Sequence, residues 1–271
     1  MGLDAKPLQV SHAYQMVSAE LEARILDGRL RPGEQLPGEV EMAALFGVNR
    51  STIREGIRKL ETEGLVRRAS PRKLVVSIPR ARDLATRSSR ALRLLEVTFE
   101  ELWTVAIATE PLAAELAARN ADADDLARLD ANHARIIAAT AAAEAGAPDA
   151  SEDIVALDTQ FHSLVAAAGK NRALTLAREP VGFLLYAGME ALVPLLPQAP
   201  GRQVDAHAGM IEAIRARDPD TAGEWMRKHI RDFRRGYEMA GLPMDVAIAP
   251  LVPRPAARPA PAGRGGRGGK A

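Results

Sequence analysis

Cysteine is absent from the 271 residues of this chain. The chain can therefore form no disulfide framework, thiolate zinc finger, Fe–S cluster or cysteine nucleophile, and a reducing cytoplasm fits. Long apolar runs are missing too, because the most apolar stretch, residues 181–196, is short and is broken by Glu190 and Pro194. The first residues lack the apolar core of a secretory signal. We therefore expect a soluble, cytoplasmic protein with no membrane partner.

The net charge is also close to zero, since 36 Lys and Arg side chains almost balance 35 Asp and Glu side chains. This balance hides a division along the chain. Residues 1–80 carry 13 basic and 10 acidic side chains, residues 81–242 carry 18 and 24, and residues 243–271 carry five and one. The length predicts two domains. The division predicts a basic head that suits a polyanion, an acidic body and a basic tail.

The head has the pattern of three short helices followed by two short strands. Apolar periodicity and turn residues predict helices over residues 13–26, over 37–46, and from Asn49 or Ser51 to Gly64. Strands are predicted at residues 65–66 and 74–78, with a charged turn around Pro71 between them. This order is that of a winged helix-turn-helix DNA-binding domain, which we place at residues 10–78.

The body, residues 85–240, is rich in Ala and Leu, and its apolar residues recur at three- and four-residue steps. We predict an all-α bundle of six or seven helices here, so the fold class is mainly α. Helix breaks are expected near residues 120–122, 146–148, 169, 194–201 and 218–219. Residues 79–84 are expected to be a linker. Residues 243–271, rich in Pro, Gly and Arg, are predicted to be a disordered tail that either attracts nucleic acid weakly or only aids solubility.

The third predicted helix has one face suited to packing and another suited to contact. Ile53 and Ile57 share one face, while Arg50, Arg54 and Arg58 share another, at about 100° per residue. The planar fork of arginine reaches guanine O6 and N7 together, or bridges phosphates. An exposed helix whose arginines only keep it soluble would show the same stripe. The helix-turn-helix order around the stripe favours DNA reading.

Three segments of the head carry an ordered motif: Gly28-Arg-Leu-Arg-Pro-Gly-Glu-Gln-Leu-Pro37, Leu45-Phe-Gly-Val-Asn-Arg-Ser-Thr-Ile-Arg-Glu55 and Leu60-Glu-Thr-Glu-Gly-Leu-Val66. The motif resembles the winged-helix domain of GntR-type bacterial transcription regulators. The resemblance implies that DNA is met at the start of the recognition helix by Asn49, Arg50, Ser51, Thr52 and Arg54. Further DNA-binding candidates in the same basic region are Arg58, Arg72 and Lys73.

This chain departs from the GntR pattern at two places in the head. Family members usually have Arg where this chain has Val40, so one expected DNA contact is missing. The wing usually turns on glycine, whereas residues 69–73 contain none. The path of the wing and its contact with the minor groove therefore do not follow from the resemblance.

In the body, Asp158 precedes His162 by four residues on a predicted helix. The two side chains therefore share one face, within an apolar stretch, and form half of a metal site. A buried, hydrogen-bonded pair is the alternative for so short a motif. His207 and His229 lie on two later helices. If both turn inward, three imidazoles and one carboxylate surround a single point.

Several motifs of the body occur together: Glu110-Pro-Leu-Ala-Ala114, Asp158-Thr-Gln-Phe-His162, Asn171, His207-Ala-Gly-Met-Ile-Glu-Ala-Ile214 and residues 218–229. They resemble the FCD domain, the helical ligand-binding domain of the FadR subfamily of GntR regulators. Many members bind a divalent metal through one Asp and three His in this order. The resemblance thus implies a metal site formed by Asp158, His162, His207 and His229. His12 and His133 match no ligand position, and His133 is expected to be an ordinary surface residue.

The ligand set also bears on the metal and the effector. Imidazole-rich ligation favours zinc, nickel, cobalt or manganese. Four protein ligands on an octahedral ion leave two open positions, where family analogy suggests a bidentate carboxylate. Members of the family commonly carry Arg a few residues before the Glu-Pro step, whereas this chain has Ala106 there. If that Arg normally pairs with an acidic effector, this protein either uses another cation or senses a different kind of molecule.

Taken together, the residues and the resemblance predict a homodimeric transcription regulator, not an enzyme. It binds an inverted-repeat operator in double-stranded DNA and senses a small organic acid at a metal centre. One alternative is a metal-dependent hydrolase with a nucleic-acid-binding head. Another is a bundle that only dimerises, with a structural metal or an acyl-CoA effector. The sequence does not identify the effector, the operator or the native metal, nor does it separate a repressor from an activator.

Overall fold

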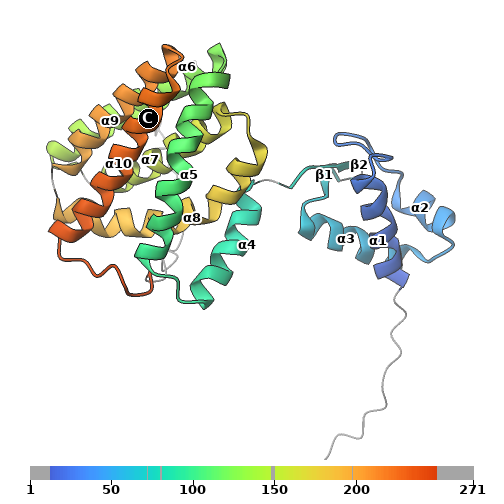
Figure 1. The fold of residues 1–271 in the computed structure, drawn as a ribbon. Coiled ribbons are helices and arrows are strands. Elements are labelled where there is room, and N and C mark those ends of the chain that lie inside the picture. The colour runs from blue at the N-terminus through green and yellow to red at the C-terminus, as the bar shows by residue number, and fades with distance from the viewer. Residues whose placement is uncertain (1–12, 72, 80, 148–149, 197, 249–271) are drawn as a thin grey trace, which may run out of the picture.

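A computed structural model of the chain describes residues 13–71, 73–79, 81–147, 150–196 and 198–248. Figure 1 shows two domains, of which the first combines helices with strands and the second consists of helices alone. This order confirms the predicted fold class, a winged helix-turn-helix followed by a helical bundle. None of the helices in the described ranges is long and apolar enough to cross a membrane.

The first domain packs three helices around a small apolar core. Its elements are α1 (Ala13–Leu26), α2 (Glu39–Phe46), α3 (Arg50–Glu63), β1 (Val66–Ser70) and β2 (Lys73–Val76). Ile53 and Ile57 of α3 are fully buried, as their spacing predicts. Leu60 is fully buried with them, and the three pack with residues of α1 and α2. Gly47 ends α2 in the left-handed region, at φ 64°, which favours glycine and allows the tight turn into α3.

The two strands form an antiparallel wing in which Val66 pairs with Val76. They differ from the prediction at both ends. Strand β1 continues to Ser70, because the backbone ladder holds the charged, exposed residues after Val66. Strand β2 begins at Lys73 and ends before Ile78, whose side chain is 70% exposed. The register shifts between Arg68 and Ser70, so the hydrogen-bond ladder between the two strands is irregular next to the turn of the wing, which contains no glycine.

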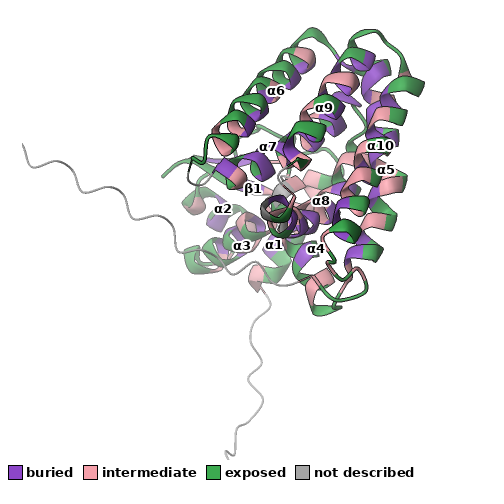
Figure 2. Cartoon of the chain, turned by 90° about the vertical axis from the view of Figure 1, so that its left-hand side faces the viewer, coloured by how far each residue is buried: buried purple, intermediate pink, exposed green. Residues whose placement is uncertain are grey.

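The second domain is a bundle of seven α-helices and one 3-10 turn among the described residues. The elements are α4 (Ala81–Leu94), α5 (Phe99–Asn120), α6 (Ala123–Glu144), α7 (Ala150–Ala168), α8 (Arg172–Leu192), η1 (Val193–Leu195), α9 (Ala199–Arg215) and α10 (Pro219–Met239). Helix α5 packs against α7, α8, α9 and α10, and α7 packs against α6 and α8. Figure 2 shows buried residues on the faces that these helices turn towards one another.

The helix breaks follow local signals in the sequence. The breaks expected near residues 120–122, 169 and 218–219 lie between helices, and Asp218 caps α10 through the backbone N–H of Thr221. Gly201, expected within a break, instead lies in the first turn of α9. A break before Phe99 was not predicted, although Thr98 and Glu101 form a capping box there.

Two boundaries differ from those expected. Helix α4 starts at Ala81, inside the segment expected to be a linker. The segment expected to be a tail is ordered at its start, because the Glu100 N–H donates to the Met244 carbonyl and the Ile248 N–H to the Val97 carbonyl. Backbone pairing with the start of α5 thus fixes residues that composition alone marks as tail. Residues 249–271, which hold the Gly- and Arg-rich end, lie outside the described residues.

Candidate metal centre and DNA-reading helix

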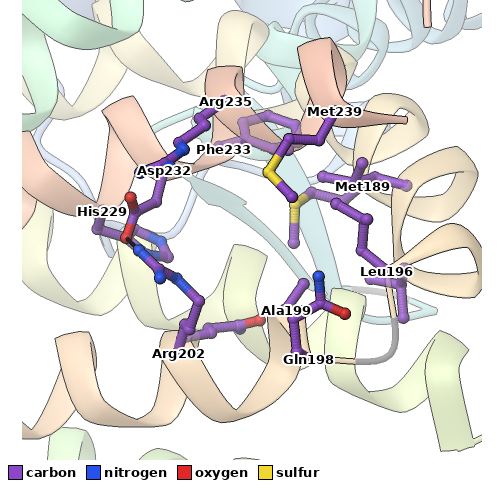
Figure 3. Close-up of a pocket in the computed structure, with 14 residues that line it drawn as sticks. Met189, Leu196, Gln198, Ala199, Arg202, His229, Asp232, Phe233, Arg235 and Met239 are labelled. Atoms are coloured by element: carbon purple, nitrogen blue, oxygen red, sulfur yellow. Dashed lines mark hydrogen bonds and ion pairs between the residues drawn. The ribbon is translucent and has the colours of Figure 1, made fainter. Parts of the chain in front are cut away.

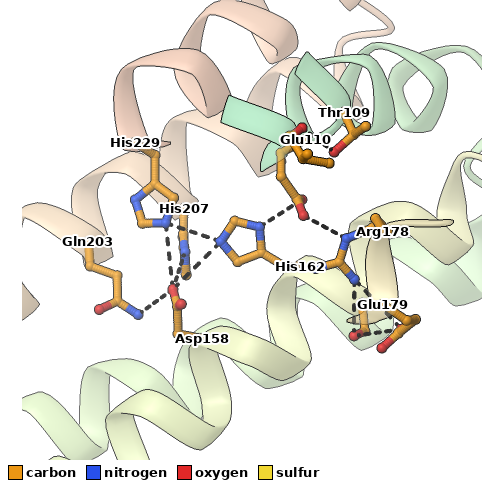
Figure 4. A network of polar contacts seen from close by, with 11 residues as sticks. Thr109, Glu110, Asp158, His162, Arg178, Glu179, Gln203, His207 and His229 are labelled. Carbon is orange, nitrogen blue, oxygen red and sulfur yellow. Dashed lines mark hydrogen bonds and ion pairs between the residues drawn. The ribbon is translucent and has the colours of Figure 1, made fainter. Parts of the chain in front are cut away.

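Three helices bring four buried side chains to one point in the bundle. Asp158 and His162 lie one turn apart on α7, His207 lies on α9, and His229 on α10. One potential ligand atom of each lies within 4.8 Å of those of the other three. Figure 4 shows the four side chains pointing towards one another. The structure therefore brings together all four residues predicted as metal ligands.

The distances within this group suit a single ion. Asp158 Oδ1 lies 3.3 Å from Nε2 of His207, 3.6 Å from that of His229 and 3.9 Å from that of His162. The Nε2 atoms of His162 and His229 are 3.2 Å apart. Neighbouring ligands on an ion with bonds of about 2.1 Å lie roughly 3.0 to 3.4 Å apart. The four atoms need only small movements to reach such a sphere.

His207 provides an independent test of the fit. Both of its ring nitrogens are buried; Nε2 lies 3.3 Å from the carboxylate of Asp158, and neither nitrogen makes a well-formed hydrogen bond to any described residue. Its ring stacks on Phe161, with centroids 3.7 Å apart. Burial lowers the pKa of His207 to about 3, so the imidazole is neutral and can offer a lone pair. A buried imidazole nitrogen without a well-formed hydrogen bond is costly, and a metal bond at Nε2 would satisfy that atom.

Asp158 is the anionic member of the group. Burial alone would raise its pKa, but the imidazoles of His207 and His229 hold that pKa well below its usual range. The amide of Gln203 on α9 donates to Asp158 Oδ1 at 2.8 Å. Gln203 thus fixes the orientation of the carboxylate from the helix that also carries His207.

A second carboxylate lies behind His162. Glu110 of α5 is buried, and its Oε2 atom lies 2.9 Å from Nδ1 of His162. Its Oε1 atom accepts a hydrogen bond of 2.6 Å from Nε of Arg178 on α8. Burial alone would raise the pKa of Glu110, but Arg178 and His162 lower it to about 2. The anion therefore favours a proton on Nδ1 of His162, which leaves Nε2 free to face the other ligands.

Sequence reasoning did not assign Glu110, Arg178 or Gln203 to the site. Each is a polar residue in an apolar helix, and each is at most 5% exposed. Gln203 precedes His207 by four residues, so helical spacing could have placed it on the same face. Nothing in the local sequence links Glu110 to Arg178, which lies 68 residues away.

His133 differs from its expected surface position. It is half-buried, its Nδ1 atom is enclosed, and its ring centroid lies 6.4 Å from that of His207. Helix α6 packs against α7 and α9, and this packing covers the polar stretch that carries His133. His12 lies outside the described residues.

A cavity of about 50 Å³ opens beside the candidate metal centre. Its lining includes Asp158, His162 and His229, together with Glu110 and Arg178. Ala106, which stands where the family commonly has Arg, also lines this cavity. A buried arginine, Arg178, paired with Glu110, thus lines the same cavity as the position where the sequence pattern left one missing.

In the first domain, the start of α3 is organised by Asn49. Its Oδ1 atom accepts hydrogen bonds from the Thr52 N–H at 2.8 Å and from the hydroxyls of Ser51 and Thr52. These three predicted DNA-binding residues thus form the helix cap among themselves. The amide NH₂ of Asn49 and the exposed side chain of Arg50 lie at this end of the helix.

The remaining predicted DNA-binding residues differ in their surroundings. Arg54 is paired with Glu39 of α2, with Nη2 3.2 Å from Oε2, and Arg58 is paired with Glu55 at the same distance. Lys73 is exposed at the start of β2. Arg72 lies outside the described residues. The side chain of Arg54 on α3 thus forms an ion pair with Glu39 of α2 and connects the two helices.

Comparison with known proteins gives a match for each domain. Residues 13–76 match the family described as bacterial regulatory proteins, gntR family, and residues 101–232 match the FCD domain. The chain is 26% identical over 256 residues to the HTH-type transcriptional repressor NanR of Salmonella schwarzengrund (strain CVM19633) and of Salmonella typhi. Each alignment covers 88% of this chain and 89% of the relative.

A solved structure supports the same relationship. The chain resembles Streptococcus agalactiae GntR with a TM-score of 0.58 and 25% sequence identity. The match covers 82% of this chain and 99% of that one. All four residues of the candidate metal centre lie within the part that matches the FCD domain.

Proposed function

The chain belongs to the GntR family of bacterial regulatory proteins and carries an FCD effector-binding domain, and from this membership we propose a metabolite-responsive repressor that acts in the cytoplasm. Family membership confirms a transcription regulator that is not an enzyme, in place of the hydrolase alternative. Repression is supported by the NanR relatives, which are named repressors.

We infer that Asp158, His162, His207 and His229 hold one divalent transition metal. The convergence of these four buried side chains is the observation that carries the proposal. Three imidazole donors favour zinc, nickel, cobalt or manganese. When bound, the ion supplies positive charge and open coordination positions for a carboxylate. Glu110 and Gln203 keep His162 and Asp158 oriented towards it.

The effector is then a small organic acid whose carboxylate occupies the cavity beside Arg178. This guanidinium is 2% exposed, and its Nη2 atom packs over Gly182, where a Cβ atom would lie only 2.7 Å away. A side chain at position 182 would therefore displace this guanidinium. Planar, fixed guanidinium groups suit carboxylates better than a flexible ammonium does. Arg178 can therefore take the role of the arginine that is absent at Ala106.

The DNA contact is proposed for the start of α3, where Arg50 and Arg54 flank the cap formed by Asn49. A homodimer places two such helices on an inverted-repeat operator. Exposed apolar side chains at the end of α4, Leu94 and Leu95, offer surface that a second subunit would cover. The effector changes operator affinity only if it binds the two dimer geometries unequally.

Coupling between the domains is proposed to pass through α4. The Arg87 guanidinium on α4 donates to the Thr62 carbonyl near the end of α3. Helix α4 also packs against α8, the helix that carries Arg178. A carboxylate that moves Arg178 can thus alter the position of α4 and, through Arg87, that of α3.

A thermal-shift assay tests the proposal directly. Metal-loaded and chelator-treated protein are compared in the presence of acetate and other small carboxylates, because a ligand of the native state raises the apparent stability. We expect a carboxylate-dependent rise in Tm for the metal-loaded protein only. A metal-loaded protein that no carboxylate stabilises would point instead to a purely structural ion.

A further inference from the structure

A second and larger cavity lies next to the small one. It has a volume of about 170 Å³ and lies between the end of α8, the start of α9 and the C-terminal half of α10 (Figure 3). Its apolar lining is formed by Met189, Leu192, Val193, Leu196, Phe233 and Met239. The only candidate metal ligand in its wall, among the described residues, is His229.

The two cavities share part of their walls. Met189, His229 and Phe233 line both of them. The small cavity is lined by the buried charged residues Arg178 and Asp158, whereas the charged residues of the large one, Arg202, Asp232 and Arg235, are all at least partly exposed and most of its lining is apolar. A single ligand that passes between the three shared residues and occupies both cavities would therefore have a charged head and an apolar tail.

We propose that the effector is a monocarboxylate with an apolar tail of about six to eight carbon atoms. An apolar cavity of about 150 Å³ accommodates benzene, so one of this size takes a tail of that order. The carboxylate lies in the small cavity and the tail in the large one. The inference rests on the proposed function and adds the chemical class of the effector.

Charged residues at the wall of the large cavity do not favour a second carboxylate on the tail. Arg202 is 55% exposed and paired with Asp232, with Nη2 2.6 Å from Oδ2, so solvent screens its charge, whereas Arg178 is buried. Arg235 is exposed and belongs to the mouth of the cavity. A second carboxylate in the apolar interior would lose its hydration without gaining a partner. A diacid of the same length should therefore bind more weakly.

Isothermal titration of the metal-loaded full-length protein with acetate, butanoate, hexanoate and octanoate tests this inference. Each added CH₂ group should strengthen binding about four-fold until the cavity is filled. Adipate, a diacid with the length of hexanoate, should bind at least about ten-fold more weakly than hexanoate. Metal content is measured on the same samples.

A cavity-filling variant with a matched control locates the tail. Ala199 is the first residue of α9 and lines the large cavity, whereas Ala123 is the exposed first residue of α6. In Ala199→Phe the gain from acetate to hexanoate should largely vanish, while acetate affinity and metal content stay at the wild-type value. Ala123→Phe should behave like the wild type.

The outcomes separate this inference from the proposed function. Equal affinities for acetate and hexanoate would overturn the apolar tail and leave carboxylate sensing intact. Tighter binding of adipate than of hexanoate would also overturn it, and would assign Arg235 or Arg202 to the ligand. If metal-loaded protein binds none of the carboxylates, both the inference and the proposed function fail.

Discussion

Glu110 Oε2 lies 2.9 Å from Nδ1 of His162, and this contact joins α5 to the candidate metal centre on α7. The carboxylate orients the imidazole and sets the tautomer in which Nε2 faces Asp158 and His229. Arg178 holds the same carboxylate from the other side at 2.6 Å. The cavity beside Arg178 and the candidate metal centre are thus linked through one buried anion.

Glu110→Gln should therefore weaken metal binding. The amide keeps the shape of the side chain but loses the charge that favours a proton on Nδ1 of His162. We expect metal affinity to fall about 10- to 100-fold, as for other residues that orient ligating histidines. Competition with a chromogenic chelator measures the affinity. Glu100→Gln, an exposed position on the same helix, is the control, and equal losses in both variants would contradict the orienting role.

Gly182→Ala should weaken effector binding without loss of metal. A Cβ atom at this position would lie 2.7 Å from Nη2 of Arg178 and would force the guanidinium to move. We expect acetate affinity to fall about ten-fold, the cost of one charge-assisted hydrogen bond. Gly188→Ala, on the same helix, meets the Tyr237 hydroxyl at the same distance and controls for destabilisation. Unchanged acetate affinity in Gly182→Ala would remove Arg178 from the carboxylate site.

Arg54→Ala should weaken binding to the operator far more than binding to random DNA. A base-reading arginine contributes about 1 to 3 kcal/mol, whereas a phosphate contact contributes equally to all sequences. Arg58→Ala, one turn later, should instead weaken both kinds of binding alike. Fluorescence anisotropy with labelled duplexes measures the affinities. Operator affinity unchanged by Arg54→Ala would remove this residue from the reading role, and metal content should stay constant throughout.

Arg87→Ala should uncouple the domains. Its contact with the Thr62 carbonyl joins α4 to α3. We expect the variant to bind operator and carboxylate as the wild type does, while the effect of the carboxylate on operator affinity falls severalfold. Arg90→Ala, an exposed position on the same helix, is the control. Full coupling in Arg87→Ala would place the route elsewhere.

The sequence predicted features that depend on short spacing. Asn49 was one of two residues expected to cap α3, and it does. The four-residue step from Asp158 to His162 predicted a shared helix face. The inward turn of His207 and His229 required the family resemblance, because helical spacing does not say how separate helices rotate against one another.

Other features depend on distant partners and did not follow from the sequence. Glu110 and Arg178 pair with each other across 68 residues of sequence, and either charge buried alone would be costly. The length of β1 depends on its ladder with β2, which holds Arg67 and Arg68 in a strand despite their charge. His133 is covered by the packing of α6 against α9, which its own polar stretch does not indicate.

Metal content is the measurement that tests the central claim most directly. Elemental analysis of purified protein should find one transition-metal ion per chain in the wild type. His207→Ala and His229→Ala should each lose most of it, because each removes one of four buried ligands from a different helix. His133→Ala should retain the ion. A full complement of metal in both His207→Ala and His229→Ala would contradict the proposed centre.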